Sequence, residues 1–184
     1  MTESIAAGEL FLAESLATFR GQKRLAERAL EQTSDDHLHV ALDEHTNTIA
    51  VLMQHIAGNL LSRWTDFLTS DGEKSWRERD GEFVDDGKSR ADVLAHWEKG
   101  WSRLFETLSQ LTPDDLDSTV TIRGMPHTVV RAIERTIGHI GYHVGQIVML
   151  SRHLAKDDWK TLSIPRGPGE SEKFNQRTWK GERP

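Results

Sequence analysis

The sequence contains no cysteine among its 184 residues. This absence excludes disulfide bonds, zinc–thiolate sites, iron–sulfur clusters and cysteine nucleophiles. Any metal ion that the chain binds must be held by nitrogen and oxygen ligands, which leaves histidine and carboxylate side chains as the candidates.

Basic clusters and long hydrophobic runs are also missing. The formal net charge is −6, and no group of Lys and Arg stands out along the chain, so a nucleic-acid partner is not expected. The start, Met1-Thr2-Glu3-Ser4, lacks the features of a signal peptide. The uncharged run at residues 136–151 is too short to span a bilayer. We therefore expect a soluble cytoplasmic protein with no membrane partner.

Several catalytic motifs are absent as well. No glycine-rich phosphate loop, no G-x-S-x-G motif and no Glu-x-x-His pair occurs in the sequence. These absences argue against P-loop nucleotide hydrolases, serine hydrolases of the α/β type and di-iron carboxylate proteins.

Helical periodicity dominates what the sequence does contain. Apolar residues recur at steps of three and four in four segments, as in amphipathic helices; these are residues 5–33, 46–68, 89–110 and 128–154. Thr46 or Asn47 is a suitable cap for the second segment, and Ser89 for the third. The pattern predicts an all-α protein, a four-helix bundle.

Two connections and the C-terminus complete the predicted domain. Alternating β-branched residues around Gly124 predict a small hairpin before the last helix. Residues 69–88 form a long, charged connection, which we interpret as a crossover between the second and third helices, held down by Trp76 and Phe83. Whether residues 71–86 also act as a lid stays open. We expect the bundle to span residues 1–165 and a polar tail to follow at 166–184.

Three histidines are candidate metal ligands. His139 and His143 are four residues apart in a predicted helix, so their imidazoles lie one turn apart on one face. Such a pair commonly offers two nitrogen ligands to one metal ion. His55 lies to one side of the apolar stripe of its own helix, in the same rotational sense as the pair. The three rings could therefore meet in a groove of the bundle, or they could simply pack there.

Three glycines interrupt the same predicted helix, namely Gly138, Gly141 and Gly145. Each disfavours the helix by about 1 kcal/mol relative to alanine. We therefore expect a partner helix or a bound molecule to approach the backbone closely at these positions.

The histidine pattern resembles the DinB-like superfamily. One histidine in Gln54-His55-Ile56-Ala57-Gly58-Asn59 precedes the pair His139-x3-His143. Longer phrases are similar to a subgroup catalogued as a domain of unknown function, and the resemblance covers nearly the whole chain. These phrases are residues 59–74, Arg79-Asp-Gly-Glu-Phe83, Tyr142-His-Val-Gly-Gln146 and Asp158-Trp-Lys-Thr-Leu-Ser-Ile-Pro165.

The resemblance implies a four-helix bundle of DinB-like type with an uncommon helix order, often assembled as a homodimer. It also implies that His55, His139 and His143 bind a divalent metal ion, which is zinc or nickel in related proteins, with the remaining positions open to water. Related families include thiol-dependent S-transferases, a mycothiol-dependent isomerase and proteins regarded as hydrolases.

Three functions stay open at this point. The first is a metal-dependent enzyme that transfers a low-molecular-weight thiol onto a small electrophilic substrate, with metal-dependent hydrolysis as its rival. The second is a non-enzymatic metal-binding module of the stress response. The third is a bundle without a metal ion, whose histidines only pack.

Residues one or two helical turns from the candidate ligands should face the same groove. We expect Arg63 to pair with an anionic part of a substrate, and Asn59 and Gln146 to orient water or a ligand; ordinary hydrogen bonds on a helix surface are the alternative. Candidates for side chains that support the ligands are Glu134, Arg123 and the charges of residues 71–86.

Overall fold

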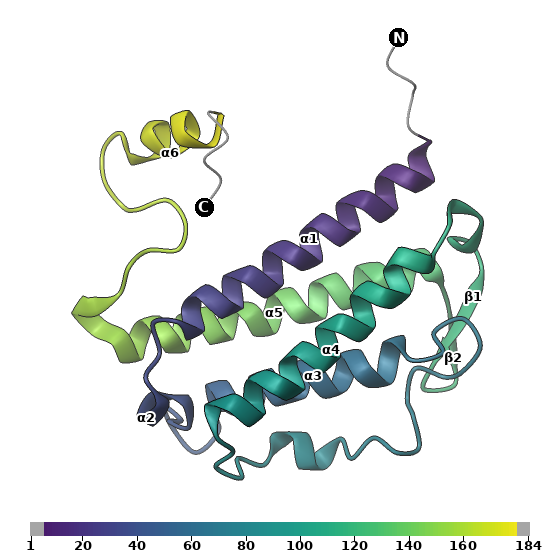
Figure 1. Cartoon of the computed structure of the whole chain (residues 1–184), viewed down its shortest axis with the longest axis horizontal. Coiled ribbons are helices and arrows are strands. Elements are labelled where there is room, and N and C mark those ends of the chain that lie inside the picture. Colours follow the sequence, from purple (N-terminus) through teal and green to yellow (C-terminus); the bar gives the residue numbers. More distant parts are fainter. Residues whose placement is uncertain (1–5, 180–184) are drawn as a thin grey trace.

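The computed structural model describes residues 6–179 of the chain. Four long helices form a bundle (Figure 1), and they are α1 (Ala7–Leu30), α3 (Ile49–Trp64), α4 (Arg90–Gln110) and α5 (Val129–Ala155). The shorter elements are α2 (Asp35–Leu38), η1 (Asp80–Phe83), η2 (Pro113–Asp115), β1 (Thr119–Ile122), β2 (Met125–Thr128), η3 (Lys156–Asp158) and α6 (Glu170–Trp179). The predicted all-α four-helix bundle is therefore confirmed.

The helices pair in an order that short loops could not produce. Helix α3 packs mainly on α4, and α1 packs mainly on α5. In Figure 1 the members of each pair run in the same direction, because the connection between α3 and α4 returns along the outside of the bundle. This connection is the long crossover predicted from the sequence. Within the described part of the chain, no helix is both long enough and apolar enough to cross a membrane.

Aromatic side chains fill the centre of the bundle. Trp64, Trp97 and Trp101 have no exposed surface, and Trp64 stacks on Phe67 with ring centroids 4.5 Å apart. Burial of such large apolar side chains is the main favourable contribution to folding. The core thus holds the inner faces of α3 and α4 in a fixed relation.

The start of α3 differs from the prediction. Its cap is Thr48, whose hydroxyl accepts a hydrogen bond from the Val51 N–H at 3.2 Å, and neither Thr46 nor Asn47 serves this role. The helix also ends at Trp64 rather than at residue 68, because the next residue is extended and Asp66 adopts a positive φ of 47°. A threonine or asparagine at three successive positions left the choice of cap open to local packing.

A two-stranded hairpin precedes α5, as predicted. Strands β1 and β2 are antiparallel, and Ile122 pairs with Met125 across the turn. Arg123 and Gly124 form the turn with positive φ values of 53° and 74°, the geometry of tight hairpin turns. Asp71 of the crossover accepts hydrogen bonds from both of their backbone N–H groups, at 2.9 and 2.8 Å. The hairpin is thereby fastened to the crossover.

The crossover is held down by one of the two predicted residues and by others that were not predicted. Trp76 is 55% exposed, so its predicted anchoring role is wrong. Instead, the Gly72 N–H donates to the Thr121 carbonyl at 2.8 Å, and the Arg77 and Glu82 side chains are buried. Phe83 does contact α3, where its ring lies 4.6 Å from that of His55.

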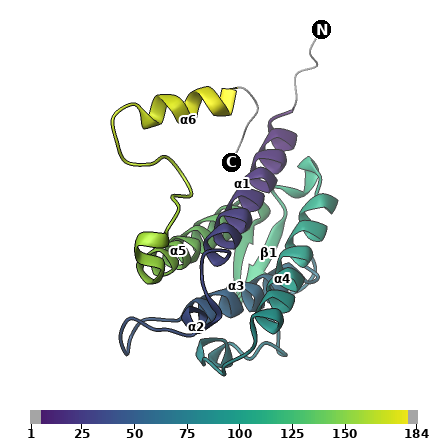
Figure 2. The ribbon, with the colours of Figure 1, turned by 60° about the vertical axis from the view of Figure 1, so that its left-hand side comes forward.

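The C-terminal segment leaves the bundle. Trp159 and Leu162 still pack against the core, whereas α6 stands apart from the four long helices in both views (Figures 1 and 2). The proposed division into residues 1–165 and 166–184 stays a prediction, and residues 180–184 of that tail lie outside the described part of the chain.

Glycine positions show where the helices approach closely. A Cβ atom on Gly100 of α4 would lie 2.8 Å from the Ala57 Cα of α3. In α5 a partner helix is not close to Gly138 or Gly145, where a Cβ would meet no atom of the described residues within 4 Å, whereas a Cβ on Gly141 would lie 3.1 Å from Gln22 Nε2 of α1. The alternative of a bound molecule at Gly138, which lines a pocket, stays a prediction. Close packing therefore occurs between α3 and α4.

We predict opposite effects for two glycine substitutions. Gly100→Ala should lower the free energy of unfolding by about 1–3 kcal/mol, because the methyl group would displace the backbone of α3. Gly145→Ala should raise it by up to about 1 kcal/mol, since alanine favours the helix and the space is open. Urea unfolding followed by circular dichroism measures both, and destabilisation of equal size would contradict the packing described.

Candidate metal centre

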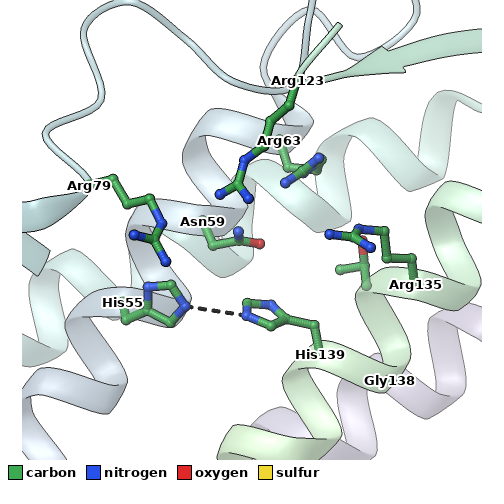
Figure 3. Close-up of a pocket in the computed structure, with 9 residues that line it drawn as sticks. His55, Asn59, Arg63, Arg79, Arg123, Arg135, Gly138 and His139 are labelled. Carbon is green, nitrogen blue, oxygen red and sulfur yellow. Dashed lines mark hydrogen bonds between the residues drawn. The ribbon is translucent and has the colours of Figure 1, made fainter. Parts of the chain in front are cut away.

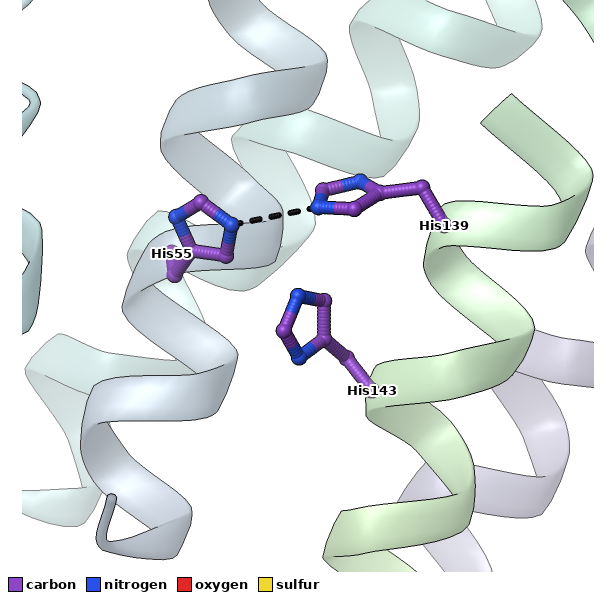
Figure 4. A group of neighbouring side chains, drawn as sticks. All are labelled: His55, His139 and His143. Carbon is purple, nitrogen blue, oxygen red and sulfur yellow. Dashed lines mark hydrogen bonds between the residues drawn. The ribbon is translucent and has the colours of Figure 1, made fainter. Parts of the chain in front are cut away.

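Three histidines converge between α3 and α5. His55 comes from α3, and His139 and His143 come from successive turns of α5 (Figure 4). One ring nitrogen of each residue lies within 4.8 Å of the other two, so the group could hold a metal ion. His55 and His143 are buried and His139 is half-buried. The structure thus brings together the three residues that the sequence singled out.

Hydrogen bonds orient two of the three rings. His55 Nδ1 lies 2.8 Å from Glu82 Oε2, and His143 Nδ1 lies 2.7 Å from Gln146 Oε1. Since both partners are acceptors, each Nδ1 carries the proton and each Nε2 keeps its lone pair, which in His55 faces the hydrogen-bonded His139 Nε2. This tautomer is the one that a metal site needs.

The spacing of the nitrogens fits a metal ion. His55 Nε2 and His139 Nε2 are 3.2 Å apart. Two nitrogen ligands of a tetrahedral zinc ion, each at about 2.0–2.1 Å from the metal, lie about 3.3 Å apart. The rings of His55 and His139 therefore need little movement to share an ion.

The surroundings favour the neutral form of the two histidines of α5. Burial, reinforced by the nearby His143 and His55 imidazoles, lowers the pKa of His139 to about 3. Burial also lowers the pKa of His143, against the opposing effect of its hydrogen bond with Gln146. Neutral imidazoles are the form that coordinates metal ions. The two histidines of α5 are therefore ready to act as ligands at physiological pH.

A buried ion pair supports His55. Both oxygens of Glu82 accept hydrogen bonds from the Arg77 guanidinium, at 2.7 and 2.8 Å, while Oε2 also accepts from His55. Although burial opposes ionisation, the bonds from Arg77 and His55 lower the pKa of Glu82. A Cβ atom on Gly58 would lie 2.2 Å from Glu82 Oε1, so the carboxylate reaches His55 only because residue 58 is glycine.

A pocket of about 380 Å³ opens beside the histidines (Figure 3). His55 and His139 form part of its wall, and no acidic residue lines it. Its other lining residues are Asn59, Arg63, Arg79, Arg123, Arg135, Thr136 and Gly138. The open side of the histidine group thus faces a cavity large enough for a small molecule.

The predicted neighbours of the ligands have different positions. Asn59 and Arg63 line the pocket, as expected for groove residues. Gln146 does not line it, and its side chain bonds to His143 instead. Glu134 lies on the surface beside Arg131, 3.8 Å away, which leaves Glu82 as the carboxylate that supports a candidate ligand.

Two pocket residues, Arg79 and Arg135, were not singled out from the sequence, although Arg79 is among the charges of residues 71–86 that were named as candidates. Arg79 precedes η1 in the crossover, whose path has no periodic signal. Arg135 lies one helical turn before His139 on α5, so the rule that selected Asn59 and Arg63 would have found it if it had been applied toward the N-terminus.

A family model described as "Protein of unknown function (DUF1572)" matches residues 6–168. The chain belongs to the DUF1572 family. No protein with a curated description matches it. The subgroup resemblance noted from the sequence is thereby confirmed.

This DUF1572 chain is also similar to two solved structures from Bacillus subtilis. YfiT, described as a probable metal-dependent hydrolase with an unusual four-helix bundle topology, matches with a TM-score of 0.65 and 18% identity, over 87% of this chain and 94% of YfiT. A DinB-like protein, YjoA, matches with a TM-score of 0.51 and 15% identity, over 80% of this chain and 96% of YjoA. These likenesses show a shared DinB-like fold.

Removal of Glu82 should destabilise the DUF1572 bundle strongly. Glu82→Ala leaves the Arg77 side chain, which is 2% exposed, without its main partner, and we expect a loss of about 3 kcal/mol in the free energy of unfolding. Glu134→Ala is the control, because it removes an exposed partner and should cost less than about 0.5 kcal/mol. Chemical denaturation compares the two, and similar losses would show that the buried pair has no special role.

Proposed function

We propose that this protein is a divalent-metal-dependent hydrolase of small molecules, with zinc or nickel held by His55, His139 and His143. The observation that carries the proposal is the position of the pocket. Its wall includes His55 and His139, so a substrate in the cavity reaches the metal site directly. Structural metal sites are closed by four protein ligands, whereas catalytic sites keep a position open.

The chain's own residues have distinct tasks in this proposal. Glu82 and Gln146 hold His55 and His143 with Nε2 directed to the metal. Asn59 lies between the histidines and the arginines in Figure 3, where its amide can donate a hydrogen bond to a substrate oxygen. A bound divalent ion would supply Lewis acidity and make coordinated water nucleophilic near neutral pH.

Hydrolysis is favoured over thiol transfer because it needs no reactant besides water. The chain has no cysteine, and the only hydroxyl side chain that lines the pocket, Thr136, donates to the Ala132 carbonyl at 2.8 Å. The description of YfiT as a probable metal-dependent hydrolase supports the same reaction class. Thiol transfer, a non-enzymatic role and the homodimer stay predictions from the sequence.

Metal content tests the ligand set. Untagged protein purified without chelator or nickel resin should contain about one equivalent of zinc or nickel per chain, and His143→Ala should lose it. His153→Ala is a matched control, because His153 lies on the exposed face of the same helix and should keep the metal. Elemental analysis measures the metal content of the wild type and of both variants. Metal retained by His143→Ala would place the ligands elsewhere.

Activity tests the reaction class. The metal-loaded protein should release product from a panel of chromogenic carboxylic and phosphate esters, and chelation or His143→Ala should reduce turnover by about 100-fold or more. His153→Ala should remain active. A parallel series contains electrophiles with and without an added low-molecular-weight thiol. Turnover that appears only with thiol would contradict hydrolysis and support the transferase prediction.

A further inference from the structure

Four arginines surround the pocket beside the candidate metal centre. Arg63 comes from α3, Arg79 from the crossover, Arg123 from the hairpin turn and Arg135 from α5. In Figure 3 their guanidinium groups point toward the common space next to His55 and His139. Although the whole chain has a net charge of −6, the lining of this pocket contains only positively charged ionisable groups besides its two histidines.

Arg63 is the most unusual of the four. It is 5% exposed, and its Nη1 atom is buried without a hydrogen-bond partner among residues 6–179. The crossover covers its stem, since a Cβ atom on Gly72 would lie 2.8 Å from Arg63 Cδ. Burial, and then repulsion from Arg135, lowers its pKa to about 10, so the group is still charged at neutral pH. A buried charge without a partner is costly and is uncommon unless a ligand completes it.

Arg77 shows that the fold can neutralise a buried arginine where no ligand is needed. Its guanidinium has the carboxylate of Glu82 at 2.7 Å and that of Glu73 at 3.4 Å. Arg63 lies nearby and has no such partner among the ion pairs of the described residues. The difference between the two buried guanidiniums indicates that Arg63 is reserved for an external anion.

The remaining arginines are only partly neutralised. Arg135 has no ion pair within the described part of the chain. Arg79 lies 3.7 Å from the exposed Asp80, and Arg123 contacts Glu73 at 3.0 Å, a carboxylate that is shared with Arg77. Each of these arginines can turn toward an anionic ligand that Arg63 binds at the buried side of the pocket.

We infer that the substrate carries a compact group with at least two negative charges, either a phosphate or a pair of carboxylates, which binds to Arg63 and Arg135 beside the histidine cluster. This inference rests on the proposed function, because it names the substrate class of the same site. The paired N–H donors of an arginine guanidinium group match the oxygens of phosphate and carboxylate groups. A pocket walled by protein strengthens the attraction between the arginines and the anion.

The test measures anion binding by metal-free protein, so that the arginines act without a metal ion. Inorganic phosphate, succinate and acetate are titrated by calorimetry into the chelator-treated full-length chain at low ionic strength. We expect phosphate or succinate to bind at least tenfold more tightly than acetate, and the tighter of the two identifies the anionic group. Acetate binding as tightly as both would overturn the requirement for two charges, and no binding of any anion would overturn the inference.

Three arginine variants locate the site. Arg63→Met should weaken binding of the preferred anion by roughly tenfold or more, and Arg135→Gln by about threefold. Arg131→Gln is the matched control: Arg131 lies one turn away on the same helix, pairs with Glu134 and is not a lining residue. Its affinity should stay within about twofold of wild type. Equal weakening by Arg131→Gln and Arg135→Gln would indicate non-specific attraction and contradict the site.

Thermal stability provides a second readout. Without anion, Arg63→Met should unfold at the same temperature as wild type or at a higher one, because methionine fills the space without an unpaired buried charge. Added phosphate or succinate should raise the unfolding temperature of wild type and Arg131→Gln and leave Arg63→Met unchanged. A marked destabilisation of Arg63→Met without anion would show that the arginine serves the fold, contrary to the inference.

The two proposals can fail separately. His143→Ala, which should lose the metal, should keep the anion affinity of metal-free wild type. Wild-type protein that binds the anion but no metal ion would reject the hydrolase and retain the anion site. Metal binding without anion binding would reject the anion site alone.

Discussion

The ion pair between Arg77 and Glu82 is the interaction on which the candidate site depends. Both residues belong to the crossover, and both are buried against α3, where two hydrogen bonds link them. The same carboxylate accepts the proton of His55 Nδ1. The position of the crossover and the orientation of the His55 ring are therefore coupled. Any shift of the crossover would break either the ion pair or the bond to the histidine.

Glycines make this coupling geometrically feasible. Gly58 leaves room for Glu82 against α3, Gly72 leaves room for Arg63 beneath the crossover, and Gly100 lets α4 approach the backbone of α3. The crossover consequently serves two sides of one cavity. Its second half supports the histidine group, and its first half covers the buried guanidinium and fastens the hairpin through Asp71. An acidic chain thus contains a cationic pocket.

Much of the architecture could be predicted from periodicity, since the same spacing that makes a helix amphipathic also decides its length and its inner face. The helix angles placed His55, His139 and His143 on one groove, and Asn59 and Arg63 beside them. Predictions failed where local packing decides which of several neighbouring residues takes a role. Thr48 replaced Thr46 and Asn47 as a cap, and Trp76 stayed exposed.

The sequence by itself determined the helical bundle, the three candidate nitrogen ligands and the absence of cysteine thiols in the chain, because these follow from composition and from spacing within single helices. Only the tertiary structure decided which carboxylate supports His55, that Gln146 turns to His143, and that Arg79, Arg123 and Arg135 join Arg63. Those contacts link segments that are far apart in the sequence, and the irregular crossover between them has no period from which its path could be calculated.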